Sequence, residues 1–77
     1  MTTQKSIAIA LDTAASRAKG LGLAAATSKQ CWFLAGLIAK AGRDASDIGC
    51  QISNSQAVLT AKQASLYIND YLREQAA

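Results

Sequence analysis

Apolar residues recur every three or four positions along most of this 77-residue chain, which is the spacing of one face of an α-helix. The first such segment runs from about Thr3 to Lys19, and Thr2 or Thr3 can cap its start. Gly20 and Gly22 permit left-handed backbone and are therefore expected to end this helix. Its predicted apolar stripe consists of Ile7, Leu11, Ala14, Ala15 and Ala18.

A second helix is predicted after a short apolar connector at residues 21–26. It begins at Thr27 or Ser28 and continues to Ala41, and Gly42 is a typical residue for a helix end. Turning 100° per residue separates two faces of this helix. The predicted inward face consists of Gln30, Phe33, Leu34, Leu37, Ile38 and Ala41.

The next segment, from Arg43 to Leu59, is rich in Asp, Ser, Asn and Gln. We expect an ordered polar loop there, with at most a short helical turn near residues 44–48. The last helix is expected from Thr60 to about Glu74. Within it, Tyr67 and Tyr71 are one turn apart and are expected at the edge of the core, with their hydroxyls in water.

The composition agrees with one all-α domain spanning residues 1–77, a compact bundle of three main helices with a long polar loop before the last helix. The chain has no Pro, and Ala, the best helix former, makes up 17 of its residues. A chain of this size buries only about 60% of the surface of its unfolded form, so the core is expected to be thin. A homodimer through alanine-rich helix faces is compatible with this sequence.

Several classes of chemistry find no support in the sequence. The chain has no His for acid–base catalysis and no Gly-rich phosphate loop, so a non-enzymatic protein is expected. Cys31 and Cys50 cannot supply the four ligands of a zinc site, and we expect no metal and no cofactor. No stretch approaches the roughly 20 apolar residues of a membrane helix. A cytoplasmic protein that contacts no membrane is expected, with both cysteines as reduced, buried thiols rather than a disulfide.

Charge is distributed unevenly along the chain. Residues 1–43 carry a net charge of +5, whereas residues 44–77 carry a net charge of −2. Such an asymmetry is typical of a protein with an anionic partner, either nucleic acid or an acidic protein face.

The second helix carries the clearest candidate for a binding surface. By helical spacing, Lys29, Trp32, Gly36 and Lys40 share a strip that Arg43 would extend. An aromatic ring among cations can stack on a base or enter a pocket of a protein, while the cations meet phosphates or carboxylates. In the alternative interpretation, Trp32 packs on the first helix and the lysine stems lie over it. The predicted partner-binding residues are Lys29, Trp32, Lys40, Arg43, Arg17 and Lys19.

Two of the helix starts repeat one motif 33 residues apart. Thr27-x-x-Gln30 and Thr60-x-x-Gln63 are both capping boxes, in which Thr and Gln satisfy each other's backbone N–H groups. Convergent capping and an internal duplication both explain the repetition, and convergent capping is the simpler explanation.

Further residues extend this motif into a longer pattern. They are Phe33, Leu37, Ala41-Gly42, Leu59-Thr60, Gln63-Ala64-Ser65 and Ile68. With them, residues 27–72 resemble a small helical module of uncharacterised phage and mobile-element proteins. In that module a T-x-x-Q helix precedes an L-T-x-x-[EQ]-A-S-x-x-I-x-x-L helix. Here Tyr71 stands at the final Leu position and Leu72 follows it. The resemblance implies a two-helix core and fixes no biochemical role.

Two functions follow as hypotheses. The first, which we favour, is nucleic-acid binding with low sequence specificity, because no pattern for reading base edges is present. The alternative is a phage-encoded inhibitor of a host enzyme or defence complex, similar to anti-CRISPR proteins, that acts by protein–protein contact.

Overall fold

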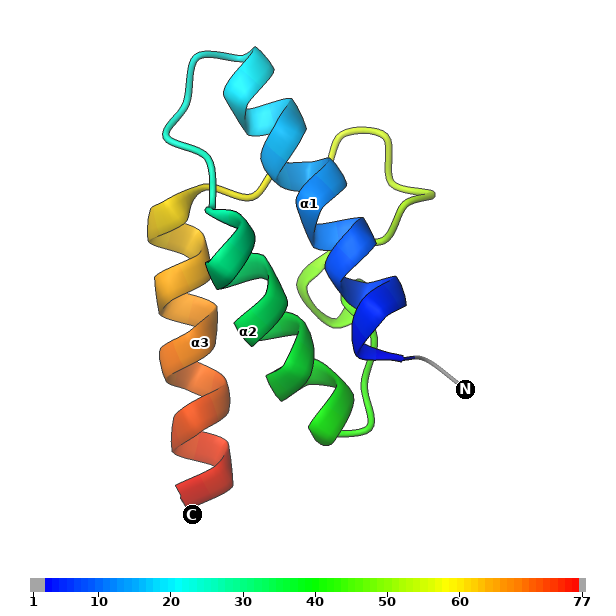
Figure 1. Cartoon of the computed structure of the whole chain (residues 1–77), viewed down its shortest axis with the longest axis vertical. Helices are drawn as coiled ribbons and strands as arrows, with labels where there is room; N and C mark the ends of the chain where they lie inside the picture. The colour runs from blue at the N-terminus through cyan, green and yellow to red at the C-terminus, as the bar shows by residue number, and fades with distance from the viewer. Residues whose placement is uncertain (1–2, 77) are drawn as a thin grey trace.

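The computed structural model describes residues 3–76 and has the predicted all-α architecture (Figure 1). Its elements are α1 (Gln4–Gly20), α2 (Ser28–Lys40), the short 3₁₀ helix η1 (Ala45–Ile48) and α3 (Ala61–Ala76). α1 runs antiparallel to α2, whereas α2 and α3 run in the same direction, and α2 lies between the other two helices. The segment between α2 and α3 returns along α1 to the start of α3. The molecule measures 36 × 25 × 17 Å.

Hydrogen bonds at both ends of α1 confirm its predicted limits. The Thr3 hydroxyl accepts the backbone N–H of Ser6 at 3.2 Å, and the Ser6 hydroxyl in turn accepts the Thr3 N–H at 3.3 Å. The alternative cap, Thr2, lies outside the described residues. Beyond the helix end, Gly22 has a φ of 80°, the left-handed conformation that glycine adopts without strain.

The repeated capping boxes start α2 and α3 side by side. Thr27 and Gln30 exchange hydrogen bonds of 3.1 and 3.0 Å, and Thr60 and Gln63 do the same at α3. Just before these caps, a β-bridge joins Ala25 to Thr60. The two parallel helices are therefore fixed at one common end, which holds the outer side of α2 in place relative to α3.

Most of the predicted apolar faces form the core. Residues 7, 11, 14, 15 and 18 of α1 are all buried, as expected. The largest fully buried side chains are Ile7, Leu11, Leu34, Ile38, Leu59 and Cys31. The predicted inward face of α2 is wrong at two positions. Phe33 is 50% exposed, and Ala41 is exposed. The buried arc of α2 consists of Cys31, Leu34, Ala35, Leu37 and Ile38, and Phe33 lies just beyond the edge of this arc, next to Leu37.

The polar segment before α3 is an ordered loop around one short helical turn, as predicted. Asp44 caps η1 by accepting the Ser46 N–H at 2.9 Å. The Asn54 amide then donates to the Gly49 carbonyl at 2.9 Å, and the Leu59 N–H donates to Ala14 of α1 at 3.2 Å. These bonds hold the loop against α1.

Cys31 and Cys50 are buried free thiols. Within residues 3–76, no helix combines the length and the apolar character that crossing a membrane requires.

Candidate functional site

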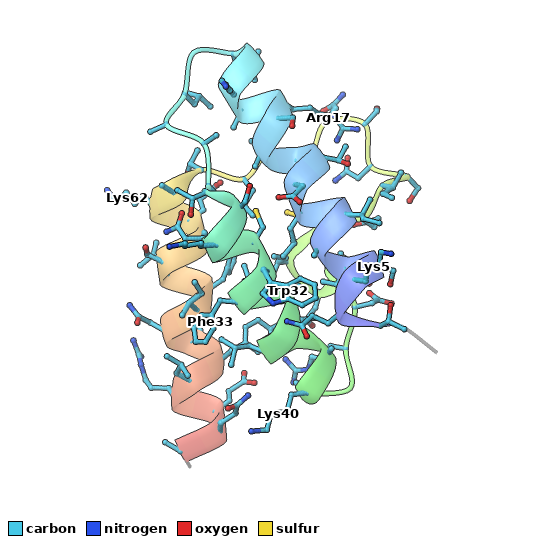
Figure 2. All side chains as sticks on the ribbon, viewed as in Figure 1. Lys5, Arg17, Trp32, Phe33, Lys40 and Lys62 are labelled. Carbon is cyan, nitrogen blue, oxygen red and sulfur yellow. The ribbon has the colours of Figure 1, made fainter. Side chains whose placement is uncertain are left out.

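The outward side of α2 carries two aromatic rings at successive positions. Trp32 is 53% exposed and Phe33 is 50% exposed. Figure 2 shows Trp32 on the side of α2 toward α1 and Phe33 on the side toward α3. The interpretation of Trp32 as a core residue is therefore wrong, because the core arc of α2 faces the opposite way. Lys29 and Lys40 lie on the same outward side by helical spacing.

The start of α1 is clamped onto α2 next to Trp32. The Gln4 side-chain amide donates to the Trp32 backbone carbonyl at 3.0 Å. This contact needs a glycine at position 36, because a Cβ on Gly36 would lie 2.7 Å from the Gln4 Nε2 atom. The clamp brings Lys5, the next residue of α1, to the side of the tryptophan (Figure 2).

Arginines and lysines have different surroundings in the structure. Within residues 3–76, every ion pair contains an arginine: Arg43 pairs with Asp47 and Glu74, and Arg73 pairs with Asp70. None of the five lysines takes part in an ion pair there. Figure 2 shows Lys40 at the end of α2, Lys5 on α1 and Lys62 on the outer side of α3, and Lys29 lies on the outward side of α2 by helical spacing. We call the set of Lys5, Lys29, Trp32, Phe33, Lys40 and Lys62 the basic aromatic face.

Arg43 does not extend this face, contrary to the sequence-based expectation. Its guanidinium lies 3.2 Å from Asp47 and 3.6 Å from Glu74, and both carboxylates hold the arginine in its charged form. The Tyr71 hydroxyl donates to the same Asp47 carboxylate, and Tyr71 is only 4% exposed. Its hydroxyl was expected in water and is instead bound within the protein. Burial, followed by the bond to Asp47, raises the pKa of Tyr71 to about 12. This cluster joins η1 to α3 and has a structural role.

The two other predicted basic residues also lie apart from the face. The Arg17 guanidinium donates to the carbonyls of Asn54 and Ala57, at 2.8 and 3.2 Å. Both acceptors belong to the polar loop, so Arg17 fastens this loop to α1. Lys19 is exposed in the last turn of α1, at the opposite end of that helix from Lys5.

Replacing Arg17 should therefore weaken the fold. Hydrogen bonds from a charged donor contribute about 1.5–3 kcal/mol, and we expect Arg17→Ala to lower the free energy of unfolding by about this amount. Urea denaturation measures the effect. Arg17→Lys keeps the charge, but its ammonium is one bond closer to the backbone than the Arg17 Nη1 atom that makes both bonds, so it should recover only part of the loss. Wild-type stability of both variants would contradict this role.

Sequence reasoning missed three members of the face, Phe33, Lys5 and Lys62. Phe33 lies beside three apolar core positions on α2, so hydrophobic periodicity alone assigns it to the core face. Lys5 and Lys62 lie on other helices, and their proximity to Trp32 depends on tertiary packing. One signal was present: neither lysine has an acidic residue three or four positions away, so neither could form an ion pair along its own helix.

Comparisons with protein-family models, with curated proteins and with solved structures give no match for this chain. Within residues 3–76, no three His, Cys, Asp or Glu side chains are grouped so that they could hold a metal ion.

Proposed function

We propose that this protein binds nucleic acid through the basic aromatic face. The observation that supports this function best is the pair of half-exposed rings on α2, a helix whose lysines form no ion pair within residues 3–76. Lysine ammoniums that meet phosphates release counterions, which favours binding to a polyanion. Aromatic rings provide surfaces on which bases stack without regard to sequence.

The distribution of carboxylates supports the same function. Asp47, Asp70 and Glu74 are engaged with arginines, and Asp44 is engaged with Ser46. The remaining acid, Asp12, lies beside the Cys31 thiol, and together with burial it raises the pKa of that thiol. Four of the five acids are thus engaged by arginines or by Ser46 and by none of the lysines of the face.

A protein partner is the second candidate. Exposed Trp residues are enriched among the side chains that dominate protein interfaces, and Trp32 fits that role on an acidic partner surface. An inhibitor of a host enzyme or defence complex would use this face. The resemblance of residues 27–72 to phage and mobile-element modules stays a prediction and is compatible with both candidates.

Neutralising two lysines of the face tests the proposal. For a single strand, each lost phosphate contact lowers the salt slope by about 0.7. We expect Lys29→Gln with Lys40→Gln to weaken oligonucleotide binding roughly 25-fold at about 0.1 M salt. Fluorescence anisotropy with a labelled oligonucleotide measures the affinity.

Arg73→Gln with Lys19→Gln is the charge-matched control, because it removes two positive charges that lie outside the face. This control should bind within about twofold of the wild type, since its charges contact no phosphate. Equal weakening by the two double variants would show that net charge alone matters and would contradict the assigned site. An absence of any binding by the wild type would leave the protein partner as the better candidate.

A further inference from the structure

We infer that the basic aromatic face binds single-stranded nucleic acid, with bases stacked on Trp32 and Phe33. This inference rests on the proposed function and adds the class of strand to it. It follows from three features of the face: the shape of the helical layer, the position of the two rings, and the spacing of the lysines.

The shape of the layer excludes reading of a duplex by α2. The major groove of B-DNA is about 12 Å wide and admits one helix of about 10–12 Å diameter. Here α2 is flanked by α1 on one side and by α3 on the other (Figure 1). The molecule is 25 Å across in this view, and α2 cannot enter a groove without its neighbours.

The two rings need partners that a duplex does not offer. In a duplex the faces of the bases are already stacked on one another, whereas an unpaired strand can turn its bases toward a protein surface. Trp32 and Phe33 point to opposite sides of the α2 ridge (Figure 2). They thus form two separate platforms, one beside α1 and one beside α3.

The lysines are placed to follow the backbone of such a strand. Lys29 and Lys40 are eleven residues apart on α2, or about 16 Å along the helix axis. This span matches a few nucleotides. Gly36 lies between them on the same side, and the Gln4 side chain packs against it.

The single tryptophan makes the inference directly measurable, because intrinsic tryptophan fluorescence comes from Trp32 alone. We would titrate the full chain with three ligands of equal length at one salt concentration: a thymidine oligonucleotide, the same strand with abasic sites, and a duplex. We expect the thymidine strand to quench the fluorescence and to bind at least tenfold more tightly than the abasic strand or the duplex.

Substitutions separate stacking from charge. Base stacking on an aromatic side chain is lost with Ala, so Trp32→Ala and Phe33→Ala should each weaken single-strand binding by about 5- to 150-fold. Because Trp32→Ala has no tryptophan fluorescence to quench, its affinity is measured by the fluorescence anisotropy of a labelled oligonucleotide. Both rings are half-buried, so the two variants should lose some stability but stay folded, and binding is compared well below their unfolding midpoints. Ile52→Ala, an exposed apolar residue of the polar loop, is the matched control and should bind as the wild type does.

The outcomes distinguish this inference from the proposed function. Equal affinity for the thymidine strand, the abasic strand and the duplex, with no quenching, would overturn base stacking and leave phosphate binding intact. No affinity for any of the three would overturn the proposed function together with the inference.

Discussion

Leu34→Ala should remove a large share of the free energy of unfolding of this protein. Leu34 is fully buried in the core between the helices. Removing such a leucine costs about 2–5 kcal/mol, because transfer free energy is lost and a cavity remains. A domain of this length has a total stability of about 4–12 kcal/mol. Many of its buried residues are alanines, which cannot shift to fill the space.

Leu66→Ala provides the matched control for this substitution. Leu66 lies on α3 and is 55% exposed, so the same chemical change there removes little buried area. Its free energy of unfolding should stay within about 0.5 kcal/mol of the wild type. Urea denaturation followed by circular dichroism measures both variants. Similar losses for Leu34→Ala and Leu66→Ala would contradict the packing of α2 described above.

The protein should also lose stability as the pH rises from about 9 to 12. Burial, followed by the neighbouring Asp12 carboxylate, raises the pKa of Cys31 from 9.0 to about 12. The pKa of Tyr71 rises from 10.0 to about 12. Because the folded state holds these protons more tightly than the unfolded chain, their contribution is complete below pH 9 and is lost as the pH passes through 12. The free energy of unfolding falls by at most about 1.4 kcal/mol per pH unit for each group, starting near pH 9 for Cys31 and near pH 10 for Tyr71.

Two variants separate these groups. Tyr71→Phe removes the tyrosine proton, together with the hydrogen bond to Asp47, and Cys31→Ala removes the thiol proton. The stability of each variant at neutral pH should be lower than that of the wild type, but it should fall less steeply between pH 9 and 12. Chemical denaturation at a series of pH values measures the slopes. Slopes identical to that of the wild type would show that neither group is linked to folding.

The helices of this fold could be predicted from the sequence because their ends are encoded locally. Thr27 with Gln30, and Thr60 with Gln63, satisfy each other's backbone groups within four residues, and Gly22 supplies the left-handed turn after α1. Even the short turn at η1 could be anticipated from its position in the polar loop. None of these features needs a distant partner.

The candidate site was only partly predictable, because its composition depends on contacts between distant segments. Arg17 acts on carbonyls 37 and 40 residues away, and Arg43 acts on Glu74, so both arginines are removed from the predicted binding set. Conversely, Lys5 reaches the site through the clamp of Gln4 on Trp32, 28 residues apart in sequence. The strip of Lys29, Trp32 and Lys40 was found because it lies on one helix.

The placement of Trp32 shows how packing settles a question that periodicity leaves open. A tryptophan on a helix of a small domain is ordinarily expected to contribute to the core. Here Cys31 and Ala35 face inward beside Leu34 and Ile38, so small and large core residues already fill the inner arc of α2. The indole remains at the surface, next to lysines. This arrangement is the physical basis of the proposed function.

The central claim is that the basic aromatic face binds a polyanionic strand, and the salt dependence of wild-type binding tests it most directly. The association constant for a labelled single-stranded oligonucleotide would be measured between about 50 and 200 mM salt, the range over which phosphate contacts are clearly resolved. Four lysines that contact phosphates predict a linear fall of log K with log salt, with a slope of about −3. A slope near zero, or no measurable binding at the lowest salt concentration, would contradict the claim.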